Sequence, residues 1–242
     1  MLPPGALLIH GFTATPECME PLASPLRKVG FEVELPLIAG HGLTYQELAK
    51  TTWEDWYEGI IESFENLQKR TSSVCVAGLS LGGLLSLKLA SEFPVKRLAL
   101  LATPVFLGGL LAKYLLPLIG NTYLKNIYPY QTKWAGPAIK DPAARAAFKS
   151  YTKMPIKSIM EIINLQKDII PRLPTITVPT LILHSPHDTT APYENLEYLK
   201  GHLGSKKIKT VTLENSDHVL TVDYDKEKVF REVVSFFQGE DS

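Results

Sequence analysis

A serine flanked by glycines, set between an apolar run and a helix, most constrains what this chain can fold into. Residues 78–82 read Gly-Leu-Ser-Leu-Gly, and a short apolar strand is predicted directly before them, over Ser73–Ala77. A helix is predicted directly after them, from Leu81 to about Glu92, with Pro94 stopping it. The pattern Gly-x-Ser-x-Gly alone arises by chance in about 8% of chains of this length. Its place between a strand and a helix is typical of a nucleophilic serine.

The glycines on either side of Ser80 have a steric reason. A strand-to-helix turn this tight leaves no room for a β-carbon two positions before or after the serine, so Gly78 and Gly82 are expected to be required. The N-terminus of the following helix favours negative charge that develops beside the serine. A phosphate-binding turn is the alternative, but no Gly-x-Gly-x-x-Gly is present. Two leucines also follow Gly83, where a phosphate loop needs Lys and then Ser or Thr.

A serine nucleophile needs a general base and an acid that orients the base. On this kind of turn they follow in the chain order serine, acid, histidine. Asp188 comes just after a predicted strand, Leu181–Ser185, and His218 follows the next one, Ile208–Leu213. Ser80, Asp188 and His218 are therefore the predicted catalytic residues.

Four other side chains near these positions are interpreted differently. His184 lies inside a predicted strand and is expected to be a core histidine. His187 is adjacent to the predicted acid, so its side chain should point elsewhere, and His202 lies at a predicted helix end, in solvent. Asp217 immediately precedes the predicted base but cannot easily reach its ring.

Ester or amide cleavage by a serine also needs N–H donors for the developing oxyanion. One donor is expected to be the N–H of Leu81, directly after the serine. The other is expected to be the N–H of Phe12, in the loop after the first predicted strand, Ala6–His10. Gly11 lets that backbone come close to the serine. His41, in a Gly-His-Gly sequence, is interpreted as a structural residue that holds a loop by hydrogen bonds.

Short apolar runs alternate with helical patterns along most of the chain. This alternation predicts an α/β fold with a mainly parallel sheet of about six strands and right-handed crossovers. Most of the runs are apolar on both faces, as buried parallel strands are. A helix is expected over about residues 53–67, begun by a capping box of Thr51 with Glu54 or of Thr52 with Asp55. The last helix is expected over about residues 226–237, and the remaining predicted strands are Phe31–Leu35 and Arg97–Thr103.

The alternation breaks once, from Pro104 to about Leu173, where the pattern is helical and no strand is predicted. This break predicts a helical cap, or lid, over residues 104–173, inserted into a core of residues 1–103 and 174–242. Lysine and arginine outnumber aspartate and glutamate in the cap, which favours transient contact with an anionic lipid interface. Seven side chains are expected either to line an acyl channel or to pack the cap onto the core: Phe106, Leu107, Leu110, Leu111, Tyr114, Leu115 and Leu118.

Charge and cysteine content exclude several classes of function. The formal net charge is zero, so no general nucleic-acid-binding surface is expected. Cys18 and Cys75 are too few for a disulfide framework and fit no zinc spacing. The first cation is Arg27, so the charged start of a secretory signal is absent and a cytoplasmic location is expected. The longest apolar stretch, Val105–Ile119, is too short and too broken to span a bilayer.

Together these motifs resemble the α/β-hydrolase superfamily, and within it the small bacterial carboxylesterases and monoacylglycerol lipases. The resemblance covers positions 10–218 and is carried by six motifs: His10-Gly11-Phe12-Thr13, Gly40-His41-Gly42, Thr-Trp-Glu-Asp-Trp at 52–56, Gly78–Gly83, His187-Asp188 and Ser216-Asp217-His218. It implies a triad of Ser80, His218 and Asp188, an oxyanion hole at Phe12 and Leu81, a cap over the acyl site, and no metal or cofactor. The two leading strands common in the superfamily are expected to be absent here.

The resemblance implies a serine carboxylic-ester hydrolase that acts on medium- to long-chain acyl esters, monoacylglycerols in particular. A small-molecule ester is the expected partner, and no obligate protein partner is implied. A thioesterase or a carbon–carbon bond hydrolase using the same triad is the alternative. Dehalogenases are disfavoured because they need a carboxylate where Ser80 stands. A binding protein that kept the fold and lost the chemistry is a remote alternative, since such proteins normally lose a triad member.

Overall fold

Six strands pair in parallel at the centre of the computed structural model, which describes residues 1–108, 129–132 and 136–240. The strand order is β2-β1-β3-β4-β7-β8, which confirms the predicted parallel α/β sheet. Each predicted strand boundary differs from the observed one by at most two residues. The strands are β1 (Gly5–Ile9), β2 (Glu32–Glu34), β3 (Val74–Leu79), β4 (Leu98–Leu101), β7 (Thr180–His184) and β8 (Ile208–Thr212).

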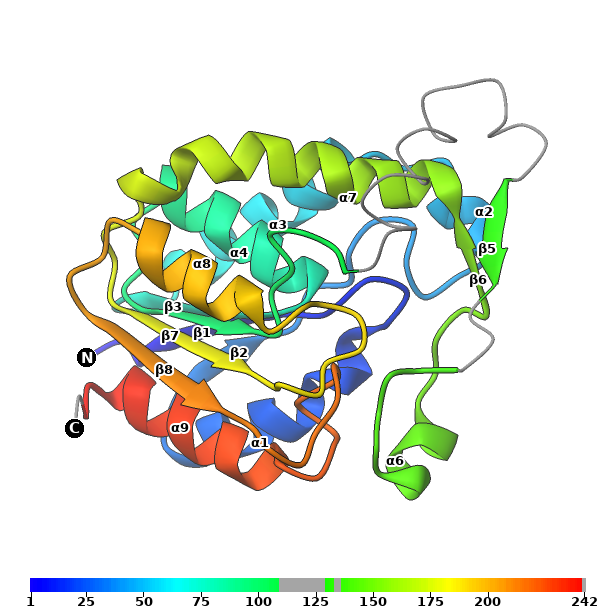
Figure 1. The fold of residues 1–242 in the computed structure, drawn as a ribbon. Helices are drawn as coiled ribbons and strands as arrows, with labels where there is room; N and C mark the ends of the chain where they lie inside the picture. The colour runs from blue at the N-terminus through cyan, green and yellow to red at the C-terminus, as the bar shows by residue number, and fades with distance from the viewer. Residues whose placement is uncertain (109–128, 133–135, 241–242) are drawn as a thin grey trace.

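Helices cover both faces of this sheet, so the central strands β1, β3, β4 and β7 are buried throughout. In Figure 1, α3, α4, α7 and α8 lie on one face, and α1 and α9 lie on the other. The predicted helix over residues 81–92 is α4, and its side chains are almost entirely buried. The helices outside the 104–173 segment are η1 (Pro16–Cys18), α1 (Glu20–Lys28), α2 (Tyr45–Leu48), α3 (Trp53–Gln68), α4 (Leu81–Glu92), η4 (Ile170–Thr175, which begins inside that segment), α8 (Glu194–His202) and α9 (Lys226–Gln238).

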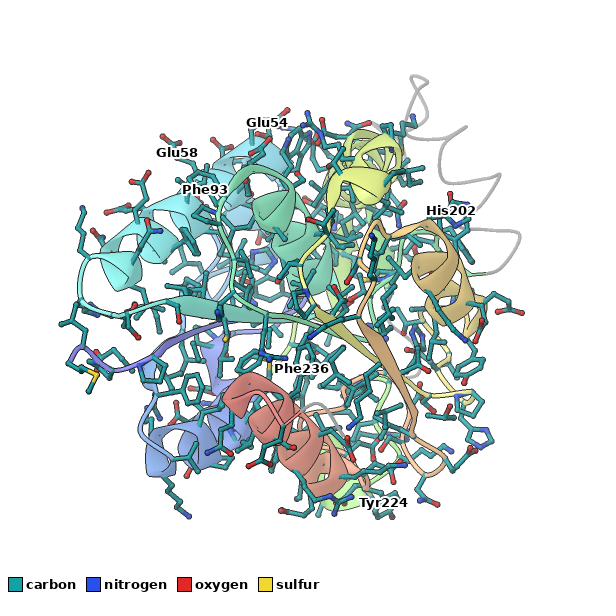
Figure 2. The ribbon with its side chains drawn as sticks, turned by 90° about the vertical axis from the view of Figure 1, so that its left-hand side faces the viewer. Glu54, Glu58, Phe93, His202, Tyr224 and Phe236 are labelled. Carbon is teal, nitrogen blue, oxygen red and sulfur yellow. The ribbon has the colours of Figure 1, made fainter. Side chains whose placement is uncertain are left out.

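The start of α3 is set by a capping box. Thr52 accepts a hydrogen bond from the backbone N–H of Asp55, whose carboxylate accepts the Thr52 N–H at 2.8 Å. This is the second of the two predicted pairs, and it satisfies two N–H groups that a helix end leaves unpaired. The outer side of α3 carries Glu54 and Glu58, which point away from the sheet in Figure 2.

Parallel pairing brings the loops that matter for function to one edge of the sheet. In the pairing of β1 with β3, Ile9 lies opposite Gly78, so the two strands end side by side. The loops after β1, β3, β7 and β8 therefore meet beyond the same carboxyl edge, which is where open α/β sheets bind their ligands.

The prediction that residues 104–173 contain no strand is wrong. A short antiparallel pair forms within this segment, in which Tyr130 of β5 (Tyr130–Thr132) pairs with Pro155 of β6 (Lys153–Pro155). Three residues are too few to show the period-two alternation of a strand, and the two partners lie far apart in the sequence. The segment also holds α6 (Pro142–Ala147) and α7 (Ile156–Ile169). Its division from the core as a separate cap stays a prediction.

The helix α7 packs on α3 and α4, next to a partly buried ion cluster. The ammonium of Lys88 on α4 lies 2.8 Å from carboxylate oxygens of Glu92 and of Asp168, the latter on α7. The Lys88 ammonium also faces the rings of Trp53 and Tyr57 on α3. This cluster joins three helices. In the part of the chain that the structure describes, no helix is long and apolar enough to cross a membrane.

Candidate active site

Ser80 occupies the turn between β3 and α4 in a backbone conformation that side chains rarely adopt, with φ of 55°. Its N–H donates to the carbonyl of Leu101 at 2.9 Å, which anchors the turn to β4. A β-carbon on Gly78 would collide with the carbonyl of Gly82, and one on Gly82 would lie 2.7 Å from the carbonyl oxygen of His10. Both positions therefore have no room for a side chain, as the tight turn requires.

His218 lies between Ser80 and Asp188. Its Nδ1 is 2.7 Å from Oδ2 of Asp188, and its Nε2 is 2.8 Å from the hydroxyl oxygen of Ser80. A carboxylate only accepts, so Nδ1 carries the proton and donates it to Asp188. The lone pair of Nε2 then faces the Ser80 hydroxyl, which donates to it. The structure thus brings together the three side chains that the sequence placed far apart, in the order in which a proton can pass from serine to histidine.

The carboxylate of Asp188 is held from both sides. Its Oδ1 accepts the backbone N–H groups of Thr190 at 2.8 Å and Ala191 at 2.7 Å, and its Oδ2 accepts from His218. Burial alone would raise the pKa of Asp188. Electrostatic attraction between the carboxylate and the His218 ring, together with hydrogen bonds from His184, His218 and Ala191, outweighs burial and holds that pKa below its usual range. The Asp188 carboxyl group is therefore ionised at neutral pH.

The competing side chains lie as expected. His184 is fully buried and donates from Nε2 to the carbonyl of Ala191 at 3.0 Å, although the same nitrogen also lies 3.5 Å from Oδ2 of the acid. His187 is exposed. His202 is exposed on α8 (Figure 2), and its ring stacks on that of Tyr198. The carboxylate of Asp217 accepts from the N–H and hydroxyl of the residue after the acid and does not bind the base.

The two expected oxyanion donors flank the serine. Among the described backbone hydrogen bonds, neither the N–H of Phe12 nor that of Leu81 has an acceptor. A β-carbon on Gly11 would lie 3.4 Å from the β-carbon of Ser80, so the loop after β1 passes directly beside Ser80. Phe12, Ser80 and Leu81 line the same cavity, so both N–H groups belong to residues next to the serine, as donors to an oxyanion must.

Two buried histidines hold that loop in place. His10 accepts the N–H of Ile38 at Nε2, at 3.1 Å, and donates from Nδ1 to the Gly11 carbonyl at 2.9 Å. Burial lowers the pKa of His10 to about 4 and that of His41 to about 3, so both are neutral at pH 7. His41 donates from Nδ1 to the Ala39 carbonyl at 3.1 Å, in line with its expected structural role. Sequence reasoning did not predict that His10 would also bind the loop of residues 38–41.

Two cavities meet at Ser80. One has a volume of about 210 Å³ and a mainly apolar lining. The other has a volume of about 620 Å³, extends toward His218, and includes Arg145 and Asp217 in its lining. The side chains shared by both linings are Phe12, Ser80, Gln131, Met154 and Thr190.

The expected acyl-lining residues divide into three groups. Leu107 lines the apolar cavity. Phe106 does not, because its ring packs edge-on against Tyr198 on α8. The other five, Leu110, Leu111, Tyr114, Leu115 and Leu118, lie outside the described residues. Sequence reasoning missed Ile159 and Ile162 of α7, which also line the cavity. Their spacing of three on a helix places both on one face, and that signal could have found them.

Among residues 1–108, 129–132 and 136–240, no group of three or more His, Cys, Asp or Glu side chains is arranged to hold a metal ion. Cys18 and Cys75 are both buried and unpaired with each other, and burial raises the pKa of each thiol to about 12.

Known proteins match this chain along nearly its whole length. A family model described as serine aminopeptidase, S33, matches residues 6–225. A thermostable monoacylglycerol lipase from Bacillus sp. (strain H-257) is 33% identical over 240 residues, which cover 97% of this chain and 90% of that protein. A carboxylesterase from Bacillus subtilis (strain 168) is 27% identical over 96% of this chain and 91% of its own length.

Solved structures agree in fold. One described under the metagenome-derived lipolytic enzymes LipS and LipT has a TM-score of 0.91 and 28% identity, and the match covers 98% of this chain and 94% of that one. The monoacylglycerol lipase of Paleococcus ferrophilus has a TM-score of 0.81 at 17% identity, over 98% and 95% of the two chains. With its parallel sheet, its serine turn and these matches, the chain belongs to the α/β-hydrolase family and is an enzyme of the esterase and lipase kind.

Proposed function

We propose that this protein hydrolyses carboxylic esters of medium- to long-chain acyl groups, including monoacylglycerols, through an acyl-enzyme formed on Ser80. The observation that carries the proposal is the pair of hydrogen bonds at His218. One nitrogen of this ring meets the Ser80 hydroxyl at 2.8 Å and the other meets Asp188 at 2.7 Å. This arrangement can activate a hydroxyl for attack on an acyl carbonyl.

Each step of the reaction has a residue to perform it. Ser80 Oγ attacks the ester carbonyl while Nε2 of His218 takes its proton, and the N–H groups of Phe12 and Leu81 bind the oxyanion. The protonated histidine then returns the proton to the departing alcohol. Water attacks the remaining acyl-enzyme by the same route, with His218 again as base. Asp188 keeps the ring in the tautomer that both steps need.

The two cavities support an ester with one apolar and one polar end. Leu107, Ile159 and Ile162 line the smaller cavity with aliphatic carbon, which suits an acyl chain. The larger cavity lies on the side of His218, the group that protonates the leaving alcohol. The first relative described above is a monoacylglycerol lipase and the second is a carboxylesterase, which suits this division.

An aminopeptidase function, which the name of the family model would suggest, has less support. Such an enzyme needs an anionic group to hold the free α-amino group of its substrate. Among the described residues that line the two cavities, Asp217 is the one carboxylate, and its oxygens already accept from Thr189. Thioester and carbon–carbon bond cleavage use the same serine chemistry and stay as alternatives.

The test compares the wild-type enzyme with the Ser80→Ala variant on p-nitrophenyl esters of two to sixteen carbons and on 1-monoacylglycerol. We expect a rate maximum at medium or long chains, cleavage of monoacylglycerol, and residual catalysis of about 10³ over water in the variant. A variant with near wild-type turnover would contradict the assignment of the nucleophile. Faster cleavage of acyl thioesters than of matched esters would favour the alternative. Contact of the cationic cap with lipid predicts faster turnover on anionic micelles at low salt.

A further inference from the structure

A buried carboxylate joins the loop of His218 to the predicted cap. Asp223 is fully buried, and each of its oxygens accepts two backbone N–H groups. Oδ2 accepts from Asp217 at 2.8 Å and from Lys140 at 2.9 Å, and Oδ1 accepts from Tyr224 and Asp141, both at 2.9 Å. A carboxylate can accept at both oxygens in this way, whereas an amide cannot. Two of these four donors, Asp217 and Tyr224, lie on either side of His218 in the chain. The other two, Lys140 and Asp141, belong to the 138–141 segment.

The same two segments are also joined directly through their backbones. The carbonyl of Ala138 accepts the N–H of His218 at 3.1 Å and the N–H of Val219 at 3.2 Å. Between this carbonyl and the N–H groups bound by Asp223, the side chain of Ile139 is fully buried in the core that also contains α9. The 138–141 segment therefore binds the backbone of His218 directly.

A further link runs from this loop to the acid. Asp217, whose N–H is bound by Asp223, uses its own carboxylate to accept the N–H of Thr189 at 2.9 Å. Thr189 is the residue after Asp188. A shift of the 217–218 backbone would thus move the base away from the serine and loosen the loop of the acid as well.

We propose that Asp223 is a positioning residue for His218: its four backbone hydrogen bonds fix the histidine loop against residues 138–141, so that the cap and the catalytic base hold one geometry together. The inference rests on the proposed role of His218 as base. Asp223 itself lines neither cavity, so it acts only through the loop it binds. An error of about 1 Å in the position of a reacting group can cost about 100-fold in rate. An enzyme without the Asp223 carboxylate should therefore have a slower chemical step while it still binds substrate.

The test compares Asp223→Asn with Asp225→Asn. Asp225 also accepts bonds from this loop, from the N–H of Asn215 at 2.8 Å and the hydroxyl of Ser216 at 3.0 Å, and it makes no hydrogen bond to residues 138–141. Both variants lose one carboxylate that binds this loop, so the comparison separates the Asp223 bonds to Asp217 and to residues 138–141 from a general loss of loop hydrogen bonds. Rates on a medium-chain p-nitrophenyl ester are divided by the fraction of sites that a fluorophosphonate labels at long incubation, which removes the effect of any misfolded fraction.

For Asp223→Asn we expect kcat per labelled site to fall by about 10- to 100-fold with KM little changed. The downfield NMR signal of the proton between His218 and Asp188 should weaken in parallel. Asp225→Asn should keep the wild-type kcat per labelled site and the wild-type NMR signal. The inference is overturned if Asp223→Asn keeps kcat within a factor of about two of wild type and an intact signal, or if Asp225→Asn loses as much.

A second pair of variants covers the case in which Asp223→Asn does not fold. Ile139→Ala and Val233→Ala each truncate a fully buried side chain in the same core, but only Ile139 lies in the segment that holds the histidine loop. A fall in kcat per site for the first variant alone supports the inference, and equal values overturn it. If the wild-type enzyme cleaves no ester, the proposed function fails, whereas the NMR signal of the His218 proton still decides the positioning role.

Discussion

Replacing Gly82 by alanine should move Ser80, the proposed nucleophile, without changing any side chain of the proposed triad. The new β-carbon would lie 2.7 Å from the carbonyl carbon of Ile9 and from the oxygen of His10, and closer still to the Ile9 oxygen. All of these are backbone atoms of the strand and loop that carry the proposed Phe12 donor. None can turn aside as a flexible side chain would.

The size of the effect follows from the geometry. Ordinary contact begins near 3.4 Å, so the 2.7 Å contacts alone require the start of α4 and the end of β1 to separate by about 0.7 Å, and the closer Ile9 oxygen requires more. That movement displaces Ser80 and the N–H of Leu81 together. At about 100-fold per ångström of misplacement, kcat/KM should fall by roughly 10- to 100-fold. Overpacking of this kind also costs about 1–3 kcal/mol, or about 2–12 °C in Tm for a domain of this size.

The matched control is Gly59→Ala in the middle of α3. A β-carbon there would meet no atom within 4 Å, so the helix gains alanine's higher propensity, about 0.5–1 kcal/mol, with no clash. Initial rates on a medium-chain ester and scanning calorimetry measure both variants. The reasoning is refuted if Gly82→Ala retains more than about a third of wild-type kcat/KM, or if Gly59→Ala loses as much.

Three further predictions concern stability and the acyl cavity. The fold should weaken as the pH falls below 6.5, because the buried His10 and His41 stay neutral to about pH 4 and 3 while the unfolded chain takes up protons first. Each histidine should lower the free energy of unfolding by about 3 kcal/mol at pH 4 relative to pH 7. Denaturant midpoints that stay constant between pH 7 and 4 would contradict this. Ile162→Phe should fill the apolar cavity and lower kcat/KM on twelve-carbon esters by about tenfold relative to two-carbon esters, with exposed Lys157→Met as control; an unchanged chain-length profile would argue against an acyl site there. Lys88→Met should lower stability by about 1–3 kcal/mol, since its two carboxylate partners are partly exposed and water replaces some of the lost attraction, and an unchanged Tm would show that the cluster contributes nothing.

The elements that the sequence predicted well are those whose signal is local. The turn at residues 78–82 needs glycine at two positions for reasons that involve only its neighbours in the chain. The helix α4 was bounded by the same turn and by a nearby proline. The four central strands are apolar on both faces, because helices cover both sides of the sheet, and that pattern can be read without a partner.

What the sequence could not reveal depends on pairs of residues that meet only in the folded chain. Nothing near Tyr130 shows that it will pair with a segment at Pro155. Leu107 lines the apolar cavity and Phe106 does not, because the Phe106 ring packs against Tyr198 on another helix.

The chain order of serine, acid and histidine was thus determined by the sequence itself, since each residue follows a strand that can be recognised alone. The distances of 2.7 and 2.8 Å at His218 were decided only by the tertiary structure. These distances require the loops after β3, β7 and β8 to be held in place by groups such as the buried carboxylate of Asp223. The partners of that carboxylate are backbone N–H groups, which any residue type other than proline can supply. Hydrogen bonds to the backbone leave no mark in the sequence of the donor, and for that reason this part of the site could be found only in the structure.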